Sequence, residues 1–117
     1  MSAQEFHNTI AGHGADVDTA FHAAREQAAY EYGHGGYTGS MAEKDSYAVF
    51  TMPSDLSADD IAQEIARHAW DSPTDERPSW ITDKLINCYD DKWGPAVAFR
   101  IVTADSDEWH FMGLASS

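Results

Sequence analysis

Residues 96–115 read AVAFRIVTADSDEWHFMGLA, and this stretch decides the fold. The first part, 96–102, is apolar apart from Arg100, which is typical of a buried strand. Residues 104–107 have the composition of a turn, and residues 108–115 are expected to be the partner strand. The stretch therefore predicts a β-hairpin in the last third of the chain.

The first third of the chain predicts one strand followed by one helix. Residues 4–11 alternate weakly between polar and apolar side chains, so a strand is expected there. In residues 16–32 an apolar stripe recurs at helical spacing, made of Val17, Phe21, Ala24, Ala28 and Tyr32. Asp16 and Asp18 lie near the predicted helix start, where carboxylates meet free backbone N–H groups, and Gly33 follows the predicted end.

The middle of the chain predicts a second hairpin and a second helix. Residues 37–43 and 47–52 are expected to be strands joined by a tight turn, and Pro53 ends the second of them. Ser57 is the expected N-cap of a helix that continues to Trp70.

A polar segment then leads to a third helix. Residues 71–79 are expected to form an exposed loop, with Ser79 capping a short helix that extends to Cys88. Residues 90–95 have turn composition.

These elements predict an α+β fold in the order β-α-β-β-α-α-β-β. Two sequential hairpins imply a mainly antiparallel sheet of about five strands, with two or three helices packed on one face. A chain of 117 residues fits one domain, so residues 1–117 are predicted to fold as a single unit. A hydrophobic content of 43% is enough to supply its core.

The charge of the chain excludes some classes of partner. Twenty acidic residues against seven Lys and Arg give a formal net charge of −13. Binding to nucleic-acid phosphates or to anionic lipid requires clustered basic side chains, so neither a nucleic acid nor a membrane is expected as a partner. Three interpretations of the acidity stay open: solubility through self-repulsion, an acidic face for a basic partner protein, and adaptation to high salt.

The single cysteine and the hydropathy pattern suggest where the protein works. Cys88 excludes an internal disulfide, and its apolar sequence neighbours indicate a buried small side chain rather than a nucleophile. No apolar run reaches membrane-spanning length, and the N-terminal residues lack the pattern of a signal peptide. A cytoplasmic location is therefore predicted.

The most unusual segment is YEYGHGGYTG, residues 30–39. Glycines let backbone N–H groups approach an anion, but here they follow a helix instead of preceding one, and no Gly-Lys-Ser/Thr is present. A helix end that runs into a tight turn, with the tyrosines packed on the sheet, is the preferred interpretation. A small-molecule pocket with His34 and Tyr37 as its polar groups is the alternative.

The sequence contains no recognisable metal or catalytic motif. The six histidines show no His-Glu-x-x-His spacing, so neither a metal nor a cofactor is expected. Glu31, His34, Tyr37 and Glu43 could form an acid–base group near the loop, but the Gly-x-Ser-x-Gly signature of a serine nucleophile is missing. Enzyme activity is left uncertain, and a non-enzymatic role is favoured. His68 falls on the apolar stripe of its helix, which predicts a histidine at the edge of the core.

Three segments carry a resemblance to known proteins. The segment YEYGHGGYTGSMAEK, residues 30–44, resembles a segment in small, uncharacterised proteins encoded by phages of actinobacteria. The segments DKWGPA, residues 91–96, and FMGLAS, residues 111–116, are similar to the C-terminal part of the same proteins. The resemblance implies a phage accessory protein that acts inside a host cell, and it carries over no catalytic residue.

The leading hypothesis is an accessory protein that binds a basic host or defence protein through its acidic surface, as an inhibitor or nucleic-acid mimic. The first alternative is a binder or hydrolase of a small molecule or nucleotide derivative that uses the 30–39 loop, and the second is a virion or assembly component. A homodimer is also left open. The candidate binding residues are Glu31, His34, Tyr37, Glu43, Asp59, Asp60 and Trp93.

Overall fold

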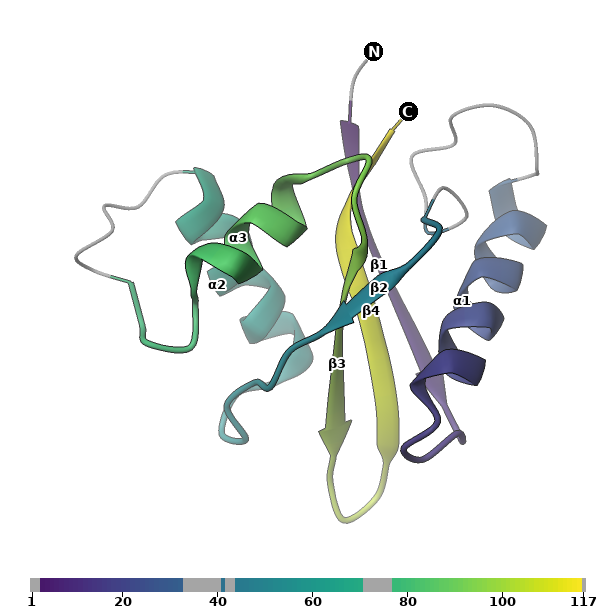
Figure 1. Ribbon diagram of the computed structural model, residues 1–117. Coiled ribbons are helices and arrows are strands. Elements are labelled where there is room, and N and C mark those ends of the chain that lie inside the picture. The colour runs from purple at the N-terminus through teal and green to yellow at the C-terminus, as the bar shows by residue number, and fades with distance from the viewer. Residues whose placement is uncertain (1–2, 33–40, 42–43, 71–76, 117) are drawn as a thin grey trace.

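The computed structural model describes residues 3–32, 41, 44–70 and 77–116 (Figure 1). In chain order its elements are β1 (Ala3–Ala11), α1 (Val17–Tyr32), β2 (Tyr47–Val49), α2 (Ala58–Trp70), α3 (Asp83–Asp90), β3 (Ala96–Val102) and β4 (Asp107–Ser116). The α+β class predicted from the sequence is confirmed. Within the described residues the sheet has four strands.

The sheet is built around the C-terminal hairpin. Its strand order is β1-β4-β3-β2, and β4 pairs antiparallel with both β1 and β3. The predicted hairpin of β3 and β4 is confirmed, and its turn is closed by the Thr103 N–H, which donates to the Ser106 carbonyl at 2.7 Å. Ala3 lies opposite Ser116, so the two ends of the chain lie side by side at one end of the sheet (Figure 1).

Strand β2 lies within the predicted strand of residues 47–52 and runs parallel to β3, so the described sheet is mixed, with two antiparallel pairs and one parallel pair. The predicted hairpin between residues 37–43 and 47–52 stays a prediction. The connection from β2 to β3 contains α2 and α3, and such a long crossover is what parallel neighbours require. Most of the predicted first strand lies outside the described residues, but Met41 is buried and its carbonyl accepts from the Lys44 N–H in a turn.

Helices cover both faces of the sheet, which corrects the prediction that they would pack on one face. In Figure 1, α1 lies on one side of the sheet and α2 and α3 lie on the other. On β3, Ala98 faces α1 whereas Val97 and Phe99 face α2 and α3. A strand buried on both faces needs apolar residues at successive positions, which is why residues 96–99 do not alternate.

Each face of the sheet has its own core. The first core, between α1 and the sheet, contains Phe6, Ala20, Phe21, Ala24, Ala28, Met41, Ala96, Ala98, Trp109, Phe111 and Ala115. The second core, between α2, α3 and the sheet, contains Ile61, Ile65, Ile81, Leu85, Tyr89, Val97, Phe99, Met112 and Leu114. His68 is also buried on α2, as its place on the apolar stripe predicted.

The N-cap residue predicted from the sequence is the observed one for α2 but not for α3. The Ser57 hydroxyl accepts from the Asp60 N–H at 3.2 Å, which confirms Ser57 as a cap. For α3 the cap is Thr82, whose hydroxyl accepts from the Leu85 N–H at 3.1 Å, so the prediction of Ser79 is wrong. The helix starts later because residues 78–81 form a turn, in which the Ile81 N–H donates to the Pro78 carbonyl.

Tyr89 joins α3 to the outer strand β1. Its side chain is buried, and its hydroxyl donates to the Glu5 carboxylate at 2.7 Å. Burial, together with this bond and the charge of Glu5, raises the pKa of Tyr89 well above its ordinary value. The folded state therefore favours the neutral phenol.

Replacing Tyr89 by phenylalanine is expected to lower the free energy of unfolding by about 1 kcal/mol at pH 7, because one buried hydrogen bond is lost. An unfolded tyrosine ionises near pH 10, so the contribution of Tyr89 is complete below that pH and is lost as the pH rises above it. Urea unfolding at pH 7 and at pH 11 should show a smaller difference between wild type and variant at pH 11. Tyr30→Phe is the matched control, since Tyr30 is 92% exposed, and an equal loss in both variants would contradict the assignment.

Candidate functional site

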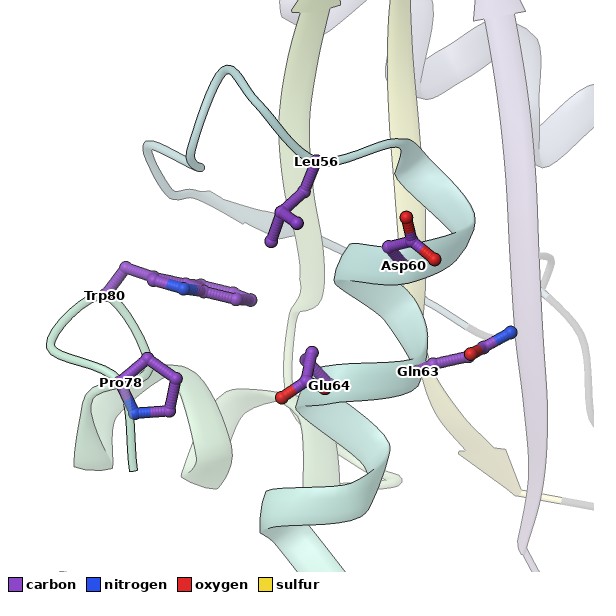
Figure 2. Close-up of a pocket in the computed structure, with 6 residues that line it drawn as sticks. All are labelled: Leu56, Asp60, Gln63, Glu64, Pro78 and Trp80. Atoms are coloured by element: carbon purple, nitrogen blue, oxygen red, sulfur yellow. The ribbon is translucent and has the colours of Figure 1, made fainter. Parts of the chain in front are cut away.

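A pocket with acidic and aromatic walls lies between α2 and the turn that precedes α3. Its volume is about 270 Å³, and it is lined by Leu56, Asp60, Gln63, Glu64, Pro78 and Trp80. Figure 2 shows the Trp80 indole extending toward α2, with Leu56 on one side of the ring and Pro78 on the other. We call this site the α2 pocket.

The two carboxylates of the α2 pocket differ in their partners. Glu64 accepts from the Arg67 guanidinium at 3.0 Å, and this bond lowers the pKa of Glu64. The Asp60 side chain is exposed and makes no ion pair within the described part of the chain. Asp60 is therefore the carboxylate of this pocket that can receive a cation from a ligand.

Asp59 and Asp60, which are candidate binding residues from the sequence analysis, have different surroundings in the structure. Asp60 lines the α2 pocket, but its neighbour Asp59 does not. The negative charge of Asp59 acts to raise the pKa of both His7 and His110. Of the two neighbouring carboxylates, only Asp60 is therefore part of the α2 pocket.

The other predicted binding residues do not join the α2 pocket. Trp93 is 60% exposed in the loop between α3 and β3, and it does not line the pocket. Glu31 lies in the last turn of α1, with its side chain outside the described residues. His34, Tyr37 and Glu43 also lie outside the described residues, as does most of the predicted 30–39 pocket.

One described residue of that segment, Tyr30, bears on the preferred interpretation of the loop. Its side chain is 92% exposed, so this tyrosine does not pack on the sheet.

Lys44 connects the start of the β2 region to the loop between α3 and β3. Its side chain is only 1% exposed, and its ammonium donates to the carbonyls of Asp91 and Gly94, both at 3.0 Å. Burial lowers the pKa of Lys44. The Cys88 thiol donates to the Pro95 carbonyl at 3.4 Å, and burial raises the pKa of this thiol, which supports the prediction that it is not a nucleophile. Lys44 therefore holds the loop of residues 91–94 through two backbone carbonyls.

A histidine pair on the sheet is a feature that the sequence did not predict. His7 Nε2 and His110 Nδ1 are 2.9 Å apart, although the residues are 103 positions apart in the chain. The Thr9 hydroxyl lies 3.1 Å from the same His110 nitrogen, and the other nitrogen, Nε2, lies 3.0 Å from the Glu108 carboxylate. We call these four residues the histidine cluster. The sequence did show that His7 and Thr9 share the polar face of the first strand. It did not predict that this strand pairs with the last one, which is what brings His110 next to His7.

The surroundings of the histidine cluster favour neutral imidazoles. Desolvation lowers the pKa of His7, and the charge of His110 acts in the same direction. Burial likewise lowers the pKa of His110, although the bond to Glu108 opposes this shift. The His110 ring is stacked on Phe99, with centroids 5.1 Å apart, so its orientation is fixed by packing as well as by hydrogen bonds. A neutral imidazole donates at one ring nitrogen and accepts at the other, so His7 and His110 can share one hydrogen bond while His110 donates to Glu108.

No family model matches the chain, and searches of curated proteins and solved structures also find no match. Within the described ranges, no helix is both long and apolar enough to cross a bilayer. Function therefore has to be inferred from the arrangement of the residues themselves.

Proposed function

We propose that this protein is a small accessory protein of phage type that binds a basic segment of a host or defence protein and thereby inhibits it. The observation that carries this proposal is the Asp60 carboxylate, which has no ion pair within the described residues and lines the α2 pocket together with Trp80 (Figure 2). The phage origin rests on the resemblance of segments 30–44 and 91–96, and the proposed place of action is the host cytoplasm.

The α2 pocket has the chemistry to hold an arginine or lysine side chain. The aliphatic stem of such a residue can pack against Leu56 and Pro78, while its charged end lies over the Trp80 indole. The Asp60 carboxylate then supplies the opposite charge at the rim. Arginine suits this site better than lysine, because its planar guanidinium can stack on the indole and pair with the carboxylate at the same time.

The net charge of the chain adds a long-range attraction to this local recognition. With −13 charges, the protein presents a negative field to any basic surface, which raises the association rate at low salt. A basic surface that normally holds nucleic-acid phosphates has the required charge. By occupying such a surface, the protein would prevent nucleic acid from binding there. It would thus inhibit its partner by mimicking the partner's nucleic acid.

Replacing Asp60 by asparagine, or Trp80 by alanine, is expected to weaken binding of a basic peptide about tenfold, since each change removes one of the two contacts to the cation. The probe is a short arginine-rich peptide titrated into ¹⁵N-labelled protein at 50 mM and at 300 mM salt. In the wild type the Trp80 indole N–H signal should shift most among the tryptophan signals, with weaker affinity at the higher salt concentration.

The matched control is Asp105→Asn, which removes the same charge from the β3–β4 turn at a residue that does not line the α2 pocket. This variant should bind the peptide about as well as the wild type does. Equal losses in Asp60→Asn and Asp105→Asn would show that only net charge matters and would overturn the assignment of the pocket. Proteins captured from host lysate by the wild type should be basic and should be lost with both pocket variants.

A further inference from the structure

We propose that the histidine cluster makes the pairing of β1 with β4 sensitive to acid: it joins the two strands at neutral pH and separates when both imidazoles are protonated. His7 Nε2 and His110 Nδ1 are 2.9 Å apart, so one proton between them closes a hydrogen bond. His7 lies opposite Met112, and His110 lies opposite Thr9. The bond therefore runs diagonally from the outer strand to the strand beside it.

The Glu108 carboxylate determines where the protons of the neutral pair lie. An ionised carboxylate only accepts hydrogen bonds, so His110 Nε2–H donates to Glu108 Oε1 and the lone pair stays on His110 Nδ1. His7 Nε2 therefore carries the proton of the shared bond, and the Thr9 hydroxyl can donate to the same Nδ1. Each imidazole has one N–H in this arrangement, and both rings are uncharged.

Acid changes this arrangement in two steps, which belong to the pair as a whole. A first proton on His7 Nδ1 leaves the shared bond in place, because a charged imidazole still donates from Nε2. A second proton has to go to His110 Nδ1, which is the acceptor of the bond. Two N–H groups would then face each other across 2.9 Å, on two positive rings whose centroids lie 5.1 Å apart. The second proton therefore breaks the bond between the strands.

Burial opposes the charged pair more strongly than the neighbouring acids favour it. Glu108 on β4 and Asp59 on α2 are the carboxylates whose charge acts on the two rings, and both favour protonation. Desolvation is the largest influence on each ring, and it lowers the pKa of both His7 and His110. The His110 side chain is shielded because its residue is only 3% exposed and Phe99 stacks on its ring at an interplanar angle of 12°.

The direction of the pH dependence follows from these shifts. Histidines of the unfolded chain take up protons near pH 6.5, whereas the folded pair takes them up only at lower pH. The contribution of the histidine cluster to stability is therefore complete above about pH 6.5 and is lost as the pH falls below it. For each proton that only the unfolded chain binds, the ratio of folded to unfolded protein falls by about tenfold per pH unit.

The first test is urea unfolding of the full chain at pH 7.5, 6.5 and 5.5. Between pH 6.5 and 5.5 the ratio of folded to unfolded wild type should fall about tenfold, because the folded pair excludes one proton. In His7→Gln the fall should be less than about threefold. The glutamine amide cannot be charged, and it can donate to a neutral His110 or, after turning, accept from a protonated one. His7 is exposed, so this variant should fold.

The matched control is His22→Gln, which replaces an exposed histidine of α1 that is not part of the histidine cluster. Its ratio of folded to unfolded protein should fall as much as that of the wild type. In the wild type, the amide protection factors of β1 should also decrease more than those of β3 between pH 6.5 and 5.5. An equally large fall in His7→Gln and wild type would overturn the proposal.

The second test uses the wild type alone and so does not depend on a variant that folds. Imidazole ¹⁵N spectra at pH 7.5 should show both His7 and His110 protonated on Nε2. His110 should still be neutral at a pH at which the histidines of the urea-unfolded chain are charged. A proton on His110 Nδ1 at pH 7.5, or His110 titrating together with the unfolded histidines, would contradict the assignment.

Discussion

Replacing Phe111 by alanine is expected to lower the free energy of unfolding by about 3–5 kcal/mol, the usual loss when a buried aromatic ring leaves a cavity. Phe111 is 0% exposed on β4, inside the first core. Its ring lies 5.8 Å from that of Phe21 on α1 and 6.3 Å from that of Tyr47 on β2. One side chain thus joins the central strand to the helix and to the edge strand. Urea unfolding followed by circular dichroism measures the loss.

The same experiment on Phe99 tests whether both faces of the sheet are buried. Phe99 is also 0% exposed, but it belongs to the second core, so Phe99→Ala should destabilise by a similar amount. Val102→Ala is the control, because this side chain is 62% exposed and should change stability by less than about 0.5 kcal/mol. A small effect at either phenylalanine would mean that one face is open to water. If an alanine variant does not fold, leucine keeps most of the apolar volume and gives a measurable loss.

Replacing Lys44 by alanine is the second change with a large expected effect, a loss of about 3 kcal/mol in the free energy of unfolding. The ammonium satisfies the carbonyls of Asp91 and Gly94, and its nitrogen lies 5.8 Å from the centre of the Phe6 ring. Alanine leaves both carbonyls without this donor and also leaves a cavity where the lysine stem was. Chemical unfolding at pH 7 measures the total loss in the free energy of unfolding. The rate of amide hydrogen exchange should rise more in residues 91–94 than in the sheet.

Lys44→Met separates the two causes, because methionine keeps much of the stem volume and removes the charged donor. The methionine variant should be less stable than the wild type but more stable than the alanine variant. Lys84→Met is the matched control on an exposed position of α3 and should be nearly neutral. A methionine variant as stable as the wild type would show that the two hydrogen bonds add nothing beyond packing.

Local signals in the sequence were sufficient for most of the individual elements. The apolar stripe of α1, the Ser57 cap of α2 and the turn between β3 and β4 all depend on residues a few positions apart. Such interactions are visible in a short window of sequence, because helix and turn periodicity come from the backbone itself. The buried lysine could not be predicted in this way, since its partners Asp91 and Gly94 lie about fifty positions further along the chain.

By itself the sequence determined the α+β class, the position of the main helices and the excess of negative charge. Tertiary structure alone decided that helices cover both faces, that β2 runs parallel to β3, and that His7 meets His110. The physical reason is the range of the interactions. Periodicity records which side of an element is buried, but strand pairing depends on which apolar surfaces fit together across the whole chain. On α2, Asp60 lines the pocket whereas its neighbour Asp59 does not, although both lie in the same acidic first turn.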